Sequence, residues 1–366
     1  MHRTKHFLTI MTLTLLLISS ITWAQQNQER LSAPRASRPA ESDPAEQTDL
    51  QANETTNPLY LPIIFQSVVV RGDTVDISNK ASVIAFYNAQ YLTSETSDAD
   101  MGWTGNVGGC NAGTTSADFR AKVLQRINFF RAMAGVPTTV TFTDALNEKA
   151  QAAALMMSAE GDLSHSPGAS WACYTVSGAS GAGQSNLYLG RNGATAITGY
   201  MQDPGSANGA VGHRRWIIYP QTLEMGTGDI PAGTGSQANA LAVFGGAASS
   251  TRTARDTFVA WPPPGYVPYN LVFARWSLSY NFVDFSAATV TMTIDGVPQS
   301  LIIENRDNGS GFSFGEDSIV WRIDSMSDGA DWPNPNGEST VHIKIENAKV
   351  SGSAQTFEYD VIIFTP

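Results

Sequence analysis

The hydrophobic period of the chain changes near residue 258, and this change limits what each half can fold into. Before it, apolar residues recur at the spacing of amphipathic helices. Beyond it, apolar and polar residues alternate in short runs, the clearest of which cover 290–294, 341–345 and 357–363. Such alternation, with Asp295-Gly296 as a hairpin turn, is typical of half-buried antiparallel strands. The sequence therefore predicts an α+β chain whose last part, residues 258–366, is all β.

The first strongly helical segment covers residues 115–134. Four apolar side chains recur there on one helical face: Phe119, Val123, Ile127 and Phe130. Thr115 and Asp118 are predicted to form the capping box, and Gly135 to end the helix.

Two further helices are predicted before residue 250. Residues 144–160 have Thr143 as N-cap and Gly161 as the end, and small residues line the buried face. Residues 194–202 end at Asp203-Pro204, because proline cannot continue a helix. Short apolar runs predict strands over residues 215–219 and 240–244.

The N-terminus has the pattern of an export signal. Two basic residues precede an apolar run over 7–21, and the small residue Ala24 follows. We predict a signal peptide over residues 1–24, with an uncleaved anchor as the alternative. Residues 25–58 are polar and are predicted to form a disordered linker. Residues 59–115 are predicted to be a lead-in segment with short strands, and no later segment is apolar enough to span a membrane.

The charge of the chain excludes several classes of partner. Removing residues 1–24 takes away two of the 22 basic residues and none of the 33 acidic ones, so the formal charge changes from −11 to −13. An acidic protein without a stripe of Lys and Arg is a poor ligand for nucleic acid or anionic membranes. We therefore expect neither as a partner.

Cys110 and Cys173 are the two cysteines of the chain. In an exported protein they are predicted to form a disulfide, which stabilises the fold by roughly 4 kcal/mol for a loop of this length. Two free thiols, or a cysteine metal site, are the alternatives. The spacing is not that of a zinc site.

Two histidines lie in short polar motifs within the helical half. His165 is in Leu163-Ser164-His165-Ser166-Pro167, and His213 is in Val211-Gly212-His213-Arg214-Arg215-Trp216. Between them come Gly183-Gln184-Ser185-Asn186-Leu187 and Ile197-Thr198-Gly199-Tyr200-Met201-Gln202-Asp203. In this order and spacing the region resembles the CAP superfamily, also called SCP domains, which includes cysteine-rich secretory proteins, antigen 5 and pathogenesis-related proteins of class 1.

The resemblance implies an α-β-α sandwich over residues 116–250 and a cavity lined by two histidines and two acidic residues. His165 and His213 match the two histidines, and Asp203 lies where the helix glutamate of the family is expected. Ser185 replaces the second acidic residue. The implied ligand-binding cleft is therefore His165, Ser185, Asp203 and His213. A metal is doubtful without that carboxylate, and zinc on His165, Asp203 and His213 is the one candidate cofactor.

Three functional hypotheses are compatible with this pattern. The favoured hypothesis is a secreted, non-enzymatic module that binds an extracellular ligand, which could be a lipid, a glycan or a protein. The alternative is a hydrolase, either metal-assisted or peptidase-like, that uses His165, Asp203 and His213. Ser185 is a weak candidate for a nucleophile, because the glycine expected two residues after such a serine is missing. A cell-surface adhesion scaffold is the third hypothesis.

Residues 258–366 are predicted to fold as a separate sandwich of the immunoglobulin or fibronectin type, with a hinge at residues 261–265. Trp276, Trp321 and Phe312 could form a carbohydrate-stacking face. Core aromatics of the sandwich are the favoured interpretation.

Overall fold

The computed structural model describes residues 74–233, 235–251, 253–311 and 314–366. The predicted signal peptide, the linker and residues 59–73 of the predicted lead-in segment lie outside these ranges. Among the described residues no helix is both long and apolar enough to cross a membrane. The predicted disulfide between Cys110 and Cys173 is present, with an S–S distance of 2.08 Å.

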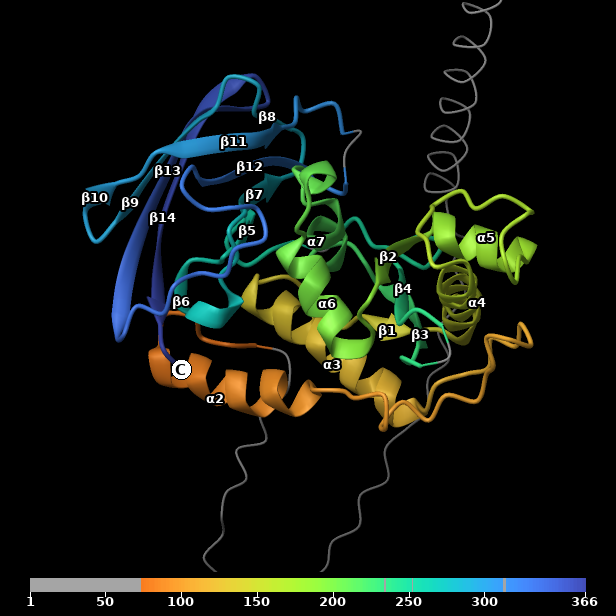
Figure 1. Ribbon diagram of the computed structural model, residues 1–366. Coiled ribbons are helices and arrows are strands. Elements are labelled where there is room, and N and C mark those ends of the chain that lie inside the picture. The colour runs from red at the N-terminus through yellow and green to blue at the C-terminus, as the bar shows by residue number, and fades with distance from the viewer. Residues whose placement is uncertain (1–73, 234, 252, 312–313) are drawn as a thin grey trace, which may run out of the picture. The chain divides into compact units, whose positions relative to one another are not determined.

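The helical half is an α-β-α sandwich, as predicted (Figure 1). Its sheet has the strand order β1-β3-β4-β2, with α4 and α5 on one face and α3, α6 and α7 on the other. The strands are β1 (Thr141–Phe142), β2 (Ser185–Leu189), β3 (Glu224–Ile230) and β4 (Ala238–Ala242). The helices are α3 (Ala117–Met133), α4 (Asp144–Glu160), α5 (Val176–Gly183), α6 (Gly193–Gln202) and α7 (Gly212–Ile217).

The helix caps explain where α3 and α4 begin. Thr143 caps α4 as predicted, and Gly161 ends it in the left-handed conformation at φ 76°. The predicted capping box of α3 is wrong by one residue, because the Ser116 hydroxyl accepts from the Phe119 amide and thus caps the helix. Thr115 is buried just outside the helix.

The strand predicted over residues 215–219 is wrong. These residues lie in helix α7 and in the turn that follows it. A short apolar run does not distinguish a strand from one turn of buried helix, and here the buried face includes Arg214 and Arg215 as well as Ile217. The strand that the sheet uses instead is the glycine-containing β3.

Glycines of β3 allow α4 to approach the sheet closely. A Cβ atom on Gly228 would lie 2.1 Å from the Gln151 amide nitrogen and 2.2 Å from the Ala150 carbonyl carbon, both in the α4 backbone. Backbone atoms of a packed helix cannot move aside as a flexible side chain can. The close contact of α4 with β3 therefore requires glycine at this position.

We expect Gly228→Ala to destabilise the protein by about 2–3 kcal/mol, because the added methyl group forces α4 away from β3. Urea unfolding monitored by circular dichroism would measure the change in free energy. Gly168→Ala is the control, since its new Cβ would meet nothing closer than 3.8 Å. Equal stability of the two variants would contradict the close-approach argument.

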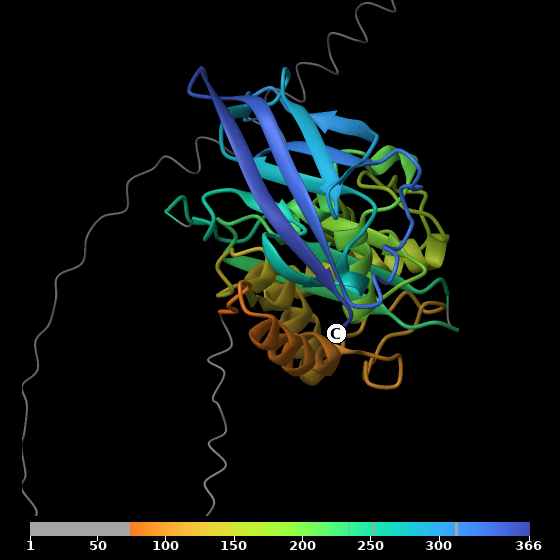
Figure 2. The ribbon, with the colours of Figure 1, turned by 90° about the vertical axis from the view of Figure 1, so that its left-hand side faces the viewer.

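The C-terminal part consists of two sheets, with the long β13–β14 hairpin across the face seen in Figure 2. One sheet has the order β10-β9-β13-β14-β6, with β8 pairing to β13, and the other has the order β11-β12-β7-β5. The first contains β6 (Gly265–Pro268), β8 (Val283–Asp284), β9 (Thr289–Ile294), β10 (Val297–Pro298), β13 (Glu338–Val350) and β14 (Ser353–Phe364). The second contains β5 (Val259–Trp261), β7 (Trp276–Tyr280), β11 (Leu301–Arg306) and β12 (Asp317–Ile323). One strand pair in the first sheet, β6 with β14, is parallel. The assignment of this part to the immunoglobulin or fibronectin type of sandwich stays a prediction.

Two aromatic interpretations are decided by burial. Trp276 and Trp321 are fully buried in the core, which confirms the favoured interpretation for these two residues, while Phe312 lies outside the described ranges. The hinge predicted over residues 261–265 stays a prediction, but its first residue is part of a strand. Trp261 is fully buried in β5, donates from Nε1 to the Leu271 carbonyl at 3.1 Å, and packs edge-on against Phe130 of α3 at 5.2 Å.

Within the lead-in segment, residues 80–94 form three consecutive helical elements. They are α2 (Lys80–Phe86), a π-helical turn (Tyr87–Tyr91) and a 3₁₀ turn (Leu92–Ser94). α2 contacts β6, and the π-helical turn contacts α3. One hydrophobic cluster includes apolar residues of this segment, of α3 and α6, and of both C-terminal sheets. The separate folding of residues 258–366 stays a prediction.

Candidate functional site

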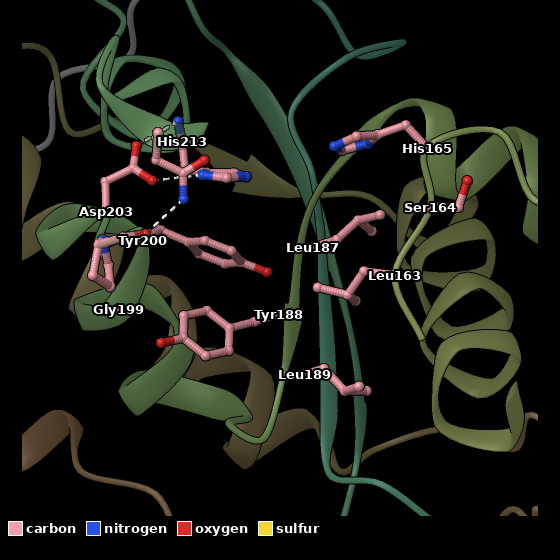
Figure 3. A pocket seen from close by; sticks show the side chains of 12 residues that line it. Leu163, Ser164, His165, Leu187, Tyr188, Leu189, Gly199, Tyr200, Asp203 and His213 are labelled. Atoms are coloured by element: carbon pink, nitrogen blue, oxygen red, sulfur yellow. Dashed lines mark hydrogen bonds and ion pairs between the residues drawn. The ribbon is translucent and has the colours of Figure 1, made fainter. Parts of the chain in front are cut away.

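A pocket with a volume of about 290 Å³ opens beside β2, between helix α6 and the loop that follows α4 (Figure 3). Its walls are mostly apolar or aromatic, and polar groups gather at its two upper sides. The lining residues are Leu163, Ser164, His165, Leu187, Tyr188, Leu189, Gly199, Tyr200, Asp203, Pro204, Asn208 and His213. The structure thus brings three of the four predicted cleft residues to one pocket.

Asp203 and His213 form a hydrogen-bonded pair on one side of the pocket. Helix α6 ends at Asp203, whose φ of 54° turns the chain away, and α7 begins at Gly212 after Val211 at φ 45°. Asp203 Oδ1 lies 2.7 Å from His213 Nδ1, and Oδ2 accepts from the His213 amide at 3.1 Å. The carboxylate is 1% exposed. Both of its oxygens are therefore engaged in fixing the histidine.

This pair sets the tautomer of His213. A carboxylate accepts hydrogen bonds and has no proton to give, so Nδ1 of His213 must carry the hydrogen. In the neutral imidazole the lone pair is then on Nε2, and the ring extends into the pocket (Figure 3). His213 thus presents a hydrogen-bond acceptor to the pocket.

His165, on the opposite wall of the pocket, has the same tautomer. Its Nδ1 lies 3.0 Å from the carbonyl oxygen of Ala182, which can only accept, so Nδ1 again carries the hydrogen. The ring extends toward the pocket from the loop after α4 (Figure 3). Two Nε2 lone pairs therefore belong to the pocket, one on each side.

Tyr200 supports His213 from below. The two rings stack with centroids 5.5 Å apart, and the Tyr200 hydroxyl donates to Asn239 Oδ1 at 2.8 Å. Burial raises the pKa of Tyr200 well above its ordinary value, with a further contribution from Asp229, so the hydroxyl stays protonated. Asn186 Nδ2 donates to the His213 carbonyl at 3.0 Å. Asn186 and Asn239 therefore serve as structural hydrogen-bond partners of the His213 backbone and of Tyr200.

Ser185 does not line the pocket. Its hydroxyl donates to the Gly181 carbonyl of α5 at 2.7 Å, and the residue is buried. The family resemblance placed Ser185 in the cleft beside the histidines. The side chain is instead used to join β2 to the last turn of α5.

A metal has few ligands to use in this arrangement. In the ranges that the structure describes, no group of three or more His, Cys, Asp or Glu side chains is placed to hold a metal ion. Asp203 orients His213 through Nδ1 and does not add a third ligand to the two imidazoles. Histidines that bind a metal are usually held through their other ring nitrogen in this way. The two Nε2 atoms are therefore the zinc ligands that this site could supply.

The apolar walls of the pocket were not identified as site residues from the sequence. Leu163 lies in the motif of His165, and Leu187 lies in the motif of Asn186, so their positions beside these motifs were a signal. Tyr188 and Leu189 follow directly on β2. Alternation along this strand was too short to show which side chains would face a cavity.

Comparison with known protein families gives one match for this region. Residues 124–246, about a third of the chain, match the model of the cysteine-rich secretory protein family, CAP. The match includes His165, Asp203, His213 and the β2 wall of the pocket. A search of curated proteins gave no match.

Proposed function

Since residues 124–246 form a CAP domain, we propose that the protein is exported and that this domain binds a small extracellular ligand without chemical turnover. The ligand class is a molecule, or the end of a larger one, with a short apolar body and a hydroxyl or amine group. The main observation behind this proposal is that His165 and His213 each have an Nε2 lone pair in a pocket that is lined by leucine and tyrosine side chains. The disulfide supports export, because such bonds persist in oxidising compartments.

The pocket dimensions and chemistry support this choice. A volume of about 290 Å³ is near the lower end for small-molecule sites. The apolar walls would cover the hydrocarbon part, and a donor group of the ligand would satisfy one of the imidazole acceptors. The formal charge of −11 for the full sequence favours a neutral or cationic ligand over an anion.

We expect hexan-1-ol and hexylamine to bind the purified protein and to shift the imidazole resonances of His165 and His213, while hexanoate binds more weakly. His213→Ala should weaken binding by about tenfold, because one hydrogen-bond acceptor is lost. NMR titration would give both the dissociation constant and the location.

His342→Ala is the matched control for this titration. His342 also lies 2.7 Å from an aspartate, Asp360, but it is half exposed on strand β13 and is not among the residues that line the pocket. Binding should be unchanged in this variant. Equal affinity of His213→Ala and the wild type would reject the pocket as the binding site.

A second candidate, a hydrolase, is favoured by one observation. A histidine held at Nδ1 by a buried carboxylate is oriented as a general base, with Nε2 free to accept a proton. Among the described residues, however, neither histidine has a recorded hydrogen bond from a serine, threonine or cysteine side chain to Nε2. Turnover of nitrophenyl esters or peptides that is lost in both His165→Ala and His213→Ala would establish the hydrolase over the binding module.

A further inference from the structure

An arginine outside the CAP segment holds the backbone of the loop that carries Asp203. Arg275 lies directly before β7 in the C-terminal part and is 2% exposed. Its Nη1 donates to the Asp203 carbonyl at 2.5 Å, and its Nη2 donates to the Gly205 carbonyl at 3.0 Å. One guanidinium therefore fixes two peptide groups just past the end of α6.

The other side of Arg275 is fixed by carboxylates of the C-terminal part. Nε donates to Glu304 of β11 at 2.5 Å, and Nη2 contacts Asp328 at 3.1 Å. Glu304 itself is largely buried and also pairs with Arg322 of β12. A planar guanidinium held at several edges has little freedom to rotate. The C-terminal part therefore sets the position of the Arg275 guanidinium, and the guanidinium in turn fixes the loop after α6.

The held residue is the one that orients His213. Asp203 has a φ of 54°, a conformation that is uncommon for a residue with a side chain. Arg275 fixes the main-chain carbonyl of Asp203, and His213 fixes the side-chain carboxylate of the same residue. A displacement of the Asp203 backbone would move the carboxylate away from Nδ1 of His213. Contacts made by Arg275 therefore restrict the geometry of the imidazole.

We propose that Arg275 is a positioning residue of the CAP pocket, so that the ligand site is complete only with the C-terminal sheets packed against it. The effect of Arg275 on binding rests on the proposed function, but its effect on the position of Asp203 and His213 can be tested without a ligand. The hydrogen on His213 Nδ1 is the reporter, because the bond to buried Asp203 protects it from exchange with water.

The experiment compares Arg275→Gln with Arg322→Gln by NMR on protein with ¹⁵N-labelled histidine. Arg322 is the matched control: it shares Glu304 with Arg275, but its other recorded acceptors are backbone carbonyls of the C-terminal part. The wild type and Arg322→Gln should show the protected Nδ1 proton of His213, assigned by its absence in His213→Ala. Arg275→Gln should lose it while circular dichroism shows a folded protein.

A second variant covers a failure of Arg275→Gln to fold. Arg275→Lys keeps the charge, but its three donors lie on a single nitrogen and cannot bridge both carbonyls and both carboxylates, so the Nδ1 proton should exchange faster than in the wild type. An unchanged proton in either folded variant would overturn the proposal. It would also be overturned if both variants unfold while Arg322→Gln folds, because Arg275 would then hold the fold as a whole.

Binding data separate this proposal from the function itself. Arg275→Gln should bind hexylamine about tenfold more weakly than the wild type, and Arg322→Gln should bind it equally well. If the wild type binds none of the probes but the Nδ1 proton behaves as described, the positioning role stands and the binding function fails. If Arg275→Gln loses the proton yet keeps full affinity, the positioning role of Arg275 in binding is rejected.

Discussion

Replacing Arg214 with methionine is expected to destabilise the protein by about 4 kcal/mol, because three buried acceptors lose their donor together. Arg214 is fully buried and donates to the Met201 carbonyl at 2.6 Å, the Arg275 carbonyl at 2.9 Å and Ser277 Oγ at 3.2 Å. Burial lowers its pKa to about 9, so the group is still charged at neutral pH. Methionine has a similar length but supplies no hydrogen to any of these oxygens.

Urea unfolding with linear extrapolation would measure this loss. Arg306→Met is the control, since Arg306 is exposed on β11 and makes one recorded hydrogen bond, to the Ala288 carbonyl at 3.0 Å. Its effect should stay within about 0.5 kcal/mol. A loss of less than about 1 kcal/mol in Arg214→Met would mean that water replaces the guanidinium, and the buried network would then not be essential to the fold.

Removing the disulfide should cost about 4 kcal/mol as well, through a different cause. Cys110 and Cys173 are 63 residues apart, and the bond restricts the unfolded chain by the loop-closure entropy of that length. In the folded state it ties the loop after α4, which carries His165, to the segment before α3. The double variant Cys110→Ala, Cys173→Ala avoids free thiols and isolates this contribution.

The same unfolding experiment applies to the disulfide, with reduced wild-type protein as the second sample. Reduced wild type and double variant should unfold at the same urea concentration, well below the oxidised protein. If only the reduced protein is destabilised, the thiols and not the missing bond are responsible. The Nδ1 proton of His213 should persist in the folded double variant, because Asp203 lies on the other side of the pocket from the disulfide-tied loop.

Local sequence signals were sufficient for several elements. The cap at Thr143 and the stop at Gly161 predicted α4 to the residue, since both act on the nearest turn of backbone. The period-two runs likewise predicted β9, β13 and β14, which each bury one face. The disulfide was predictable because the two cysteines, in a chain that was predicted to be exported, have one intramolecular pairing available.

Other features depend on partners that are distant in the sequence. Helix α7 was taken for a strand, because its burial comes from packing against α3 and α6 and from two buried arginines. Arg214 and Arg215 could not be assigned, since their acceptors lie in part in the C-terminal sheets, up to about a hundred residues away. Charge alone does not show whether an arginine faces solvent or a row of carbonyl groups.

For the site, the sequence by itself determined which side chains were available: His165, Asp203 and His213 in motifs of the right order. Only the tertiary structure decided what they can do. The Ala182 carbonyl and the Asp203 carboxylate place the hydrogen of each imidazole on Nδ1 and leave the lone pair on Nε2, while Ser185 is turned to Gly181. The physical reason is that a tautomer depends on the hydrogen-bond partner of each ring nitrogen, and these partners meet the rings only when the helices pack on the sheet.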